Sequence, residues 1–199
     1  AIRFGIARGL FTNEAGLGSA PIVDAAASTR NPVRQGLIAM TGVFWDTVIV
    51  CALTGLVLVS SILRNPDGMS GLSGGALSSA AFANIPVVGP IVLTVGLICF
   101  AWSTILGWSY YGERCWVYLC GQKAIMPFRI IYTLVVFVGS VMTLDAVWGI
   151  ADILNASMAF PNLVALLGLS GVIASETKKY LFDDNMDGWS DDEIPVVDK

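Results

Sequence analysis

The sequence predicts an all-α membrane protein in which a half-helix is followed by four transmembrane helices. Of its 199 residues, 55% are apolar and only 13% are charged, whereas roughly 25% of the residues in an ordinary soluble domain are charged. The mean hydropathy is +0.73, and a soluble domain this small could not bury so much apolar surface. The expected surroundings are therefore a lipid bilayer, and soluble enzymes, nucleic-acid-binding proteins and disordered linkers are excluded.

Residues 1–29 are predicted to form a half-helix and a cytoplasmic loop. Arg3 and Arg8 interrupt the apolar pattern, so this segment does not fit a complete span. Residues 1–11 are expected to be the half-helix, and residues 13–21 are rich in helix-breaking residues. Because the chain begins with Ala1 and no signal peptide precedes the first span, we expect a piece of a longer protein.

Residues 30–179 are predicted to form a bundle of four spans, each of which needs about 20 apolar residues. The spans are expected at residues 37–63, 85–112, 129–144 and 147–174. The Gly- and Ser-rich residues 68–83 are expected to form a loop, and a tight turn near residues 143–145 is expected between the last two spans. The 21 glycines predict closely packed helices.

Basic residues predict the orientation, since cytoplasmic loops carry an excess of Lys and Arg. In the loops that follow the first and the third span, Arg64 is the only basic residue. The other segments contain Arg30, Arg34, Arg114, Lys123, Arg129, Lys178 and Lys179. Both ends of this multi-pass protein are therefore expected on the cytoplasmic side of the cell membrane. Residues 180–199, in which Lys199 is the only basic residue among many acids, are expected to be a solvated acidic tail.

The second span carries polar and amphipathic residues on one helical face. Spacing by three and four residues places these on the same side: Phe100, Ser103, Thr104, Gly107, Trp108 and Tyr111. A sodium ion that enters a membrane exchanges its water for other oxygens, and the Ser103 and Thr104 hydroxyls and the Phe100 carbonyl would supply three. Alternatively, both hydroxyls bond to carbonyls four residues earlier in their own helix. The pattern by itself favours this alternative.

Three ionisable residues, Asp46, Arg8 and Glu14, are candidates for coupling or gating. Asp46 lies near the middle of the first span, where a carboxylate is costly; it could relay protons, neutralise a cation or pair with an Arg. Asp152 is expected in the first turn of the fourth span, with a capping or surface role. Arg8 and Glu14 could form an ion pair that closes the inner end of a pathway, or Glu14 could belong to a loop held by backbone contacts.

Catalysis is not expected. The sequence contains no His, which rules out a Ser–His pair. Asp145 and Asp152 are seven residues apart near a turn, and Asp46 has no evident partner for an aspartate dyad. No cofactor is predicted beyond a coupling cation. A proton-coupled carrier with Asp46 as the relay, or a non-transporting scaffold or channel, remains an alternative to sodium coupling.

Several sequence blocks resemble the alanine/glycine:cation symporters, the sodium–alanine symporter family. Residues 5–21 read Gly-Ile-Ala-Arg-Gly-Leu-Phe-Thr-Asn-Glu-Ala-Gly-Leu-Gly-Ser-Ala-Pro, and residues 31–36 read Asn-Pro-Val-Arg-Gln-Gly. Residues 44–47, 100–113 and 145–152 are similar to the family as well. The resemblance covers nearly the whole chain except the Gly- and Ser-rich stretch and the tail. Asp24 and Asn31 depart from it, because many relatives have His at these positions.

The resemblance implies sodium-coupled symport of a small neutral amino acid, alanine or glycine, by alternating access. It implies part of a LeuT-type fold of two inverted repeats, in which substrate binds at broken helices near the midplane. Residues 1–11 would then be half of the broken sixth core helix and the four spans core helices seven to ten, so the chain lacks the first repeat. The resemblance places Phe100, Ser103 and Thr104 at a Na⁺ site and Trp108 along the path from it, and it favours the cation-binding interpretation of the two hydroxyls.

Overall fold

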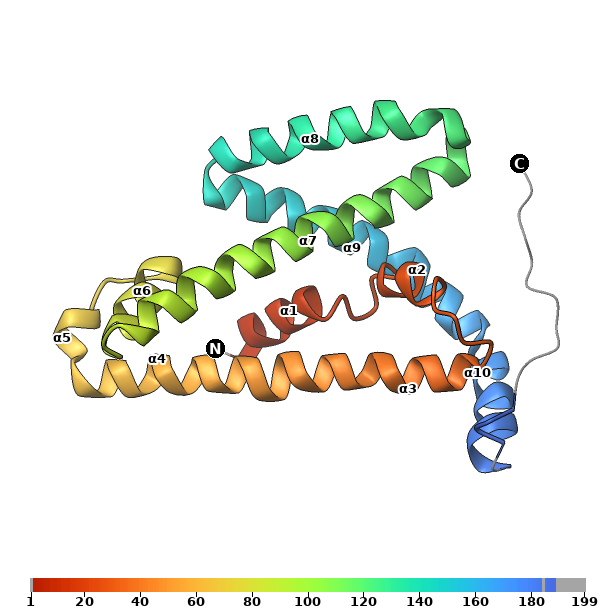
Figure 1. Cartoon of the computed structure of the whole chain (residues 1–199), viewed down its shortest axis with the longest axis horizontal. Coiled ribbons are helices and arrows are strands. Elements are labelled where there is room, and N and C mark those ends of the chain that lie inside the picture. The colour runs from red at the N-terminus through yellow and green to blue at the C-terminus, as the bar shows by residue number, and fades with distance from the viewer. Residues whose placement is uncertain (1, 184, 189–199) are drawn as a thin grey trace. The chain divides into compact units, whose positions relative to one another are not determined.

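The computed structural model of the chain describes residues 2–183 and 185–188, and all regular elements in these residues are helical (Figure 1). The chain divides into two compact units, one formed by Ala1–Gly42 with Ser109–Lys199 and the other by Val43–Trp108. Each unit is described by itself below.

Four helices in the described residues are long and apolar enough to cross a membrane, as expected. They are Pro32–Arg64, Val88–Cys120, Gln122–Val141 and Leu144–Gly168. The first three begin or end several residues beyond the predicted limits. In the first two, charged residues such as Arg34 and Arg114 belong to the helix although they lie outside the apolar run. The short turn before Leu144 confirms the predicted separation of the last two spans.

The unit Val43–Trp108 holds most of the first span and the start of the second. The first span is continuous and consists of α3 (Pro32–Val43), the π-helix η1 (Phe44–Cys51) and α4 (Ala52–Arg64). The segment expected as a Gly- and Ser-rich loop contains two helices instead, α5 (Pro66–Met69) and α6 (Gly74–Ala83). The prediction of a loop was therefore wrong for α6, whose Ala-rich sequence favours a helix.

A cap and a buried contact explain how these short helices form. The Asn65 side chain accepts a hydrogen bond from the Gly68 amide at 3.0 Å, and Pro66 stands at the first position of α5. The hydroxyl of Ser61 in α4 donates to the carbonyl of Ala81 in α6 at 3.3 Å, and Ala81 is fully buried. Because of this contact, the segment forms a helix that packs on the end of the first span and not the loop that was predicted.

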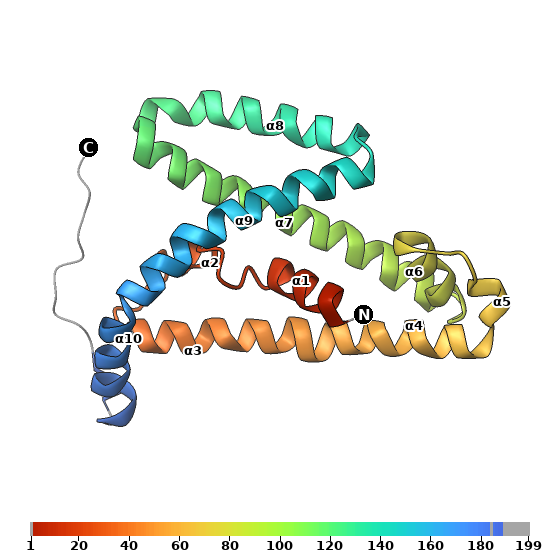
Figure 2. The ribbon, with the colours of Figure 1, turned by 180° about the vertical axis from the view of Figure 1, so that it is seen from behind.

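The other unit combines both ends of the chain with the last spans. Its N-terminal part contains α1 (Ile2–Thr12), a helix over the residues predicted to form a half-helix, and α2 (Ala20–Asp24). It also holds the end of α7 (Val88–Cys120) and η2 (Gln122–Ala124). Its C-terminal helices are α8 (Ile125–Val141), α9 (Leu144–Gly168), α10 (Ser170–Thr177) and the π-helix η3 (Lys178–Phe182). Figure 2 shows α8 and α9 joined by their tight turn.

The loop between the second and third spans is fixed by a glycine and an ion pair. Gly121 has φ 78°, a left-handed conformation that ends α7. The Arg129 Nε donates to the Glu113 carboxylate at 2.7 Å, and the Trp116 and Phe128 rings lie 6.1 Å apart. These contacts connect the end of α7 to the start of α8.

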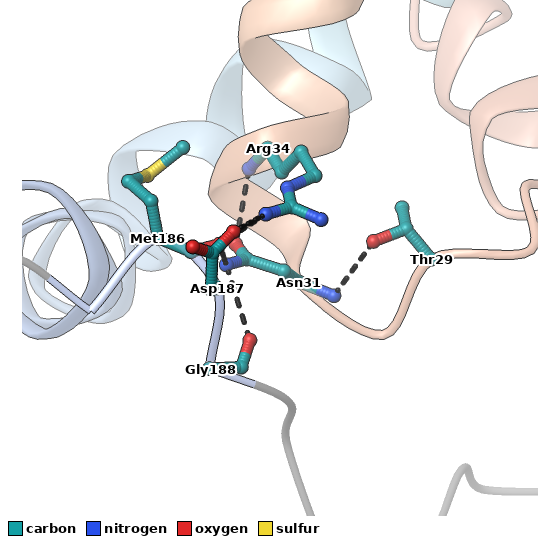
Figure 3. A network of polar contacts seen from close by, with 6 residues as sticks. All are labelled: Thr29, Asn31, Arg34, Met186, Asp187 and Gly188. Atoms are coloured by element: carbon teal, nitrogen blue, oxygen red, sulfur yellow. Dashed lines mark hydrogen bonds and ion pairs between the residues drawn. The ribbon is translucent and has the colours of Figure 1, made fainter.

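The beginning of the first span is clamped to the segment after the fourth (Figure 3). Arg34 donates to the Met186 carbonyl at 2.7 Å and pairs with Asp187 at 2.6 Å. The Asn31 amide donates to the carbonyls of Met186 at 3.1 Å and Gly188 at 3.4 Å. We call this network the terminal clamp. Two segments that flank an even number of spans lie on one side of the membrane, and the clamp agrees with that requirement.

The structure differs in part from the solvated tail expected from residue 180 onward, because Asp183 and Asp187 are exposed but Tyr180 is not. Tyr180 is fully buried in η3, and residues 186–188 belong to the terminal clamp. Composition alone cannot reveal such contacts, because backbone carbonyls are the acceptors in most of them. Residues 184 and 189–199 of the predicted tail lie outside the described residues.

Alanine at Arg34 is expected to release the terminal clamp, whereas Asn at Asp187 is not. A hydrogen bond from a charged donor contributes about 1.5–3 kcal/mol, but Asp187 is fully exposed and such ion pairs contribute little. The Gly188 amide donates to the Asn185 carbonyl at 2.9 Å and so reports on the segment. Hydrogen exchange over residues 183–188 should be roughly tenfold faster in Arg34→Ala. Equal acceleration in Asp187→Asn would contradict this account.

Candidate functional site

The α7 face that carries the candidate cation ligands is exposed in the described chain. The Ser103 hydroxyl donates to the Phe100 carbonyl at 3.0 Å, which places two oxygens of the expected set side by side. The Thr104 hydroxyl makes no hydrogen bond with a described residue. Ser103 thus bonds within its own helix, to the carbonyl three residues earlier and not the one four residues earlier that the alternative interpretation names, and Thr104 makes no such bond with a described residue. A hydroxyl that donates keeps its oxygen lone pairs, so Ser103 can still coordinate a cation.

Asp46 lies in the π-helical part of the first span, within the unit Val43–Trp108. Its Oδ2 is buried and has no hydrogen-bond partner among the described residues. The ion pair with an Arg that we considered for Asp46 is therefore not formed in the described part of the chain. π-Helical turns often occur at functional sites, which keeps Asp46 a coupling candidate.

Arg8 binds Asp152 and not Glu14. The two guanidinium nitrogens lie 3.2 and 3.3 Å from the two carboxylate oxygens, in a bidentate arrangement. The Arg8 guanidinium also stacks on the Trp148 ring at 4.0 Å, and Phe11 meets this ring edge-on at 5.4 Å. Helix α1 is therefore fastened to α9 by one Arg and two aromatic rings.

The capping role considered for Asp152 is wrong for a geometric reason, whereas its side chain does lie at the surface, 59% exposed. The prediction started the fourth span at residue 147 and so placed Asp152 in the first turn. Helix α9 begins at Leu144, which moves Asp152 to the third turn and leaves Asp145 in the first. Asp152 then lies one turn after Trp148, so the carboxylate and the indole meet Arg8 together.

Glu14 binds Ser19, and the predicted ion pair with Arg8 is wrong. The Ser19 hydroxyl donates to the Glu14 carboxylate at 2.6 Å, and Ser19 is only 2% exposed. Glu14 has φ 51°, a left-handed conformation that costs a non-Gly residue free energy. A strained residue held by a buried hydrogen bond is typical of a functional segment.

The segment from Asn13 to Ser19, which we call the glycine loop, packs on α9. Gly16 and Gly18 have φ 76° and 80°. A Cβ on Gly18 would lie 2.8 Å from the Asn162 Oδ1, whereas a Cβ on Gly16 would make an ordinary 3.8 Å contact with Leu163. Asn162 was not predicted to contact the loop. Its position beside Pro161 was a signal, because a proline within a helix removes a backbone hydrogen bond.

The two positions that depart from the family pattern make local contacts in the same unit. Asp24 accepts a hydrogen bond from the Gln35 amide at 2.8 Å. The Asn31 Oδ1 accepts from the Arg34 amide at 3.0 Å, as a helix N-cap does, and Asn31 is only 3% exposed. Both side chains therefore stabilise the start of α3.

Comparison with known proteins agrees with the resemblance read from the sequence. The model of the sodium:alanine symporter family matches residues 1–192. The chain is 53% identical over 180 residues to the sodium/alanine symporter AgcS of Methanococcus maripaludis, a match that covers 90% of this chain and 40% of that protein. It is 51% identical over 197 residues to an uncharacterized transporter of Haemophilus influenzae, covering 98% of this chain and 42% of the relative.

A more distant relative is also an amino-acid carrier. The chain is 35% identical over 181 residues to the amino-acid carrier protein AlsT of Bacillus subtilis, covering 90% of this chain and 38% of the relative. The chain thus spans about two fifths of the length of the curated relatives it matches. The names of these relatives describe a symporter, a transporter and an amino-acid carrier.

Proposed function

Because the chain belongs to the sodium:alanine symporter family, we propose that it is the second-repeat part of a carrier that moves alanine or glycine together with sodium across the cell membrane. The family match and relatives such as AgcS support amino-acid symport as the activity of the whole carrier. The coupling ion, the small neutral substrate, the LeuT-type arrangement and the cytoplasmic location of both ends are further parts of the proposal.

The pair of oxygens on α7 is the observation that carries the sodium site. The Ser103 hydroxyl and the Phe100 carbonyl are 3.0 Å apart, and Thr104 is the next residue on the same face. We assign Na⁺ to Phe100, Ser103 and Thr104, with further oxygens supplied by the first repeat. Trp108, one turn after Thr104, would line the path from the ion to the cytoplasm. Sodium binding would favour one arrangement of the helices, and the amino acid would bind that arrangement better.

Arg8 and Glu14 keep a gating role in this proposal, with the partners that they have in the structure. Arg8 fastens α1 to α9 through Asp152, and Glu14 holds the glycine loop through Ser19. If residues 2–12 are half of a broken substrate-binding helix, both contacts restrict how that helix moves during the transport cycle.

Proton coupling through Asp46 is the second candidate, and the unpartnered Oδ2 of Asp46 favours it. A carboxylate in the middle of a span needs a cation or a proton to offset its cost. Asp46→Asn distinguishes the two mechanisms. Loss of the response to pH with intact sodium dependence would assign Asp46 to proton coupling.

Uptake by the full-length protein in proteoliposomes tests the proposed function. Alanine uptake should be driven by an inward sodium gradient and should vanish when potassium replaces sodium on both sides. A proton gradient of equal size without sodium should give no more than background uptake. Uptake driven by the proton gradient alone would contradict sodium coupling and leave the Asp46 mechanism.

A further inference from the structure

We propose that residues 178–183 and 185–188 belong to a strap that restrains the first span while it is docked and frees the span when it is released. The strap begins with η3 and ends in the terminal clamp. It therefore connects the segment after the fourth span to Asn31 and Arg34 at the start of the first (Figure 3). The inference rests on the proposed carrier function, because it concerns the rate of transport.

The donors that dock the strap lie on the first span, and the acceptors are backbone carbonyls of the strap. Arg34 donates to the Met186 carbonyl, and the Asn31 amide donates to the carbonyls of Met186 and Gly188. Asn31 is held in place, since it is only 3% exposed and its Oδ1 caps α3. The ion pair with the exposed Asp187 adds little. Asn31 and Arg34 therefore decide whether the strap docks.

A buried hydroxyl of the strap opposes docking. Tyr180 is fully buried in η3, and its hydroxyl has no hydrogen-bond partner among the described residues. Such a group costs free energy that water restores once the strap is released and η3 leaves its packed position. The Asn185 amide donates to the Tyr180 carbonyl at 3.2 Å, so the hydroxyl belongs to the same hydrogen-bonded segment as the terminal clamp. The docked strap is thus favoured by less than its hydrogen bonds alone would give, as a reversible contact requires.

A docked strap opposes movement of the first span relative to the segment after the fourth. Alternating access requires helices to change their arrangement, and steps of this kind often limit the rate of a cycle. Release of the strap should therefore speed transport, and firmer docking should slow it. A clamp that only stabilised the fold would behave differently, because its loss would leave transport unchanged or slower.

Two variants with opposite expected effects test the strap in the full-length protein. Tyr180→Phe removes the buried hydroxyl, so it should slow hydrogen exchange over residues 183–188 about tenfold and lower the rate of alanine uptake in proteoliposomes. Asn31→Asp keeps the oxygen that caps α3 but removes both amide donors. It should accelerate the same exchange about tenfold and raise the uptake rate by up to about tenfold.

Asn65→Asp is the matched control for the new carboxylate. Asn65 also caps a helix through its side-chain oxygen, which accepts from the Gly68 amide, but its amide nitrogen donates to no described residue. This variant should leave the exchange of residues 183–188 and the uptake rate at their wild-type values. An equal rise in uptake in Asn65→Asp and Asn31→Asp would overturn the inference, because the added charge would then explain both.

The remaining outcomes separate the strap from the proposed function. Uptake that is unchanged or slower in Asn31→Asp, or unchanged or faster in Tyr180→Phe, would overturn the strap and give the terminal clamp a purely structural role. A wild-type protein without sodium-driven uptake would instead contradict the proposed function. Hydrogen exchange does not depend on transport, so equal exchange in the wild-type protein and both strap variants would overturn the strap in that case as well.

Discussion

Replacing Ser103 and Thr104 together by alanine is expected to lower sodium-driven alanine uptake at low sodium by about 100-fold or more. Each hydroxyl that binds a charged partner contributes about 1.5–3 kcal/mol, and about 1.4 kcal/mol corresponds to a tenfold change in affinity. The Phe100 carbonyl remains in the variant, so some sodium affinity should persist. Higher sodium should restore part of the uptake, which identifies an affinity defect.

Ser140 in α8 supplies a matched control for this double variant. Its hydroxyl donates to the Phe137 carbonyl at 2.7 Å, the same contact within a helix that Ser103 makes with Phe100. If Ser103 only stabilises its own helix, Ser103→Ala and Ser140→Ala should have equally small effects. Thr104→Ser keeps the hydroxyl and should retain sodium dependence. Unchanged sodium dependence in the double alanine variant, present at normal amounts in the membrane, would contradict the proposed site.

The spans were predictable because their signal is strong and local. In a bilayer, an uncharged apolar segment has to satisfy its own backbone hydrogen bonds, and a helix does so. The four helices agree with that argument. The helix ends were less accurate, since charges stop the apolar run before the backbone stops being helical. A shift of three residues at the start of α9 was enough to misplace Asp152 and to hide its pairing with Arg8.

Contacts between distant segments could not be predicted from the same signals. Arg8 and Asp152 are 144 residues apart, and Arg34 and Met186 are 152 apart. Several acceptors in the terminal clamp are backbone carbonyls, which every residue possesses. The glycine loop was recognised by its composition, but composition does not say that Asn162 fills the space beside Gly18.

Gly18→Ala is expected to destabilise the full-length protein more than Gly16→Ala does. Both glycines are left-handed, with φ 80° and 76°, and alanine in this conformation costs about 1–2 kcal/mol. Only at Gly18 does a Cβ also meet a side chain, with Asn162 Oδ1 at 2.8 Å and Cγ at 3.0 Å. Overpacking of this kind adds about 1–3 kcal/mol. Thermal unfolding in detergent measures the difference.

A double-mutant cycle with Asn162→Ala separates backbone strain from the clash. The alanine removes Oδ1 and Cγ but keeps the Asn162 Cβ, which would lie 3.3 Å from the new Cβ. Gly18→Ala/Asn162→Ala should therefore recover most of the overpacking cost and none of the cost of the left-handed backbone. Its remaining deficit should match that of Gly16→Ala. If Gly18→Ala and Gly16→Ala were equally stable from the outset, contact with α9 would not explain why the glycine loop has Gly at residue 18.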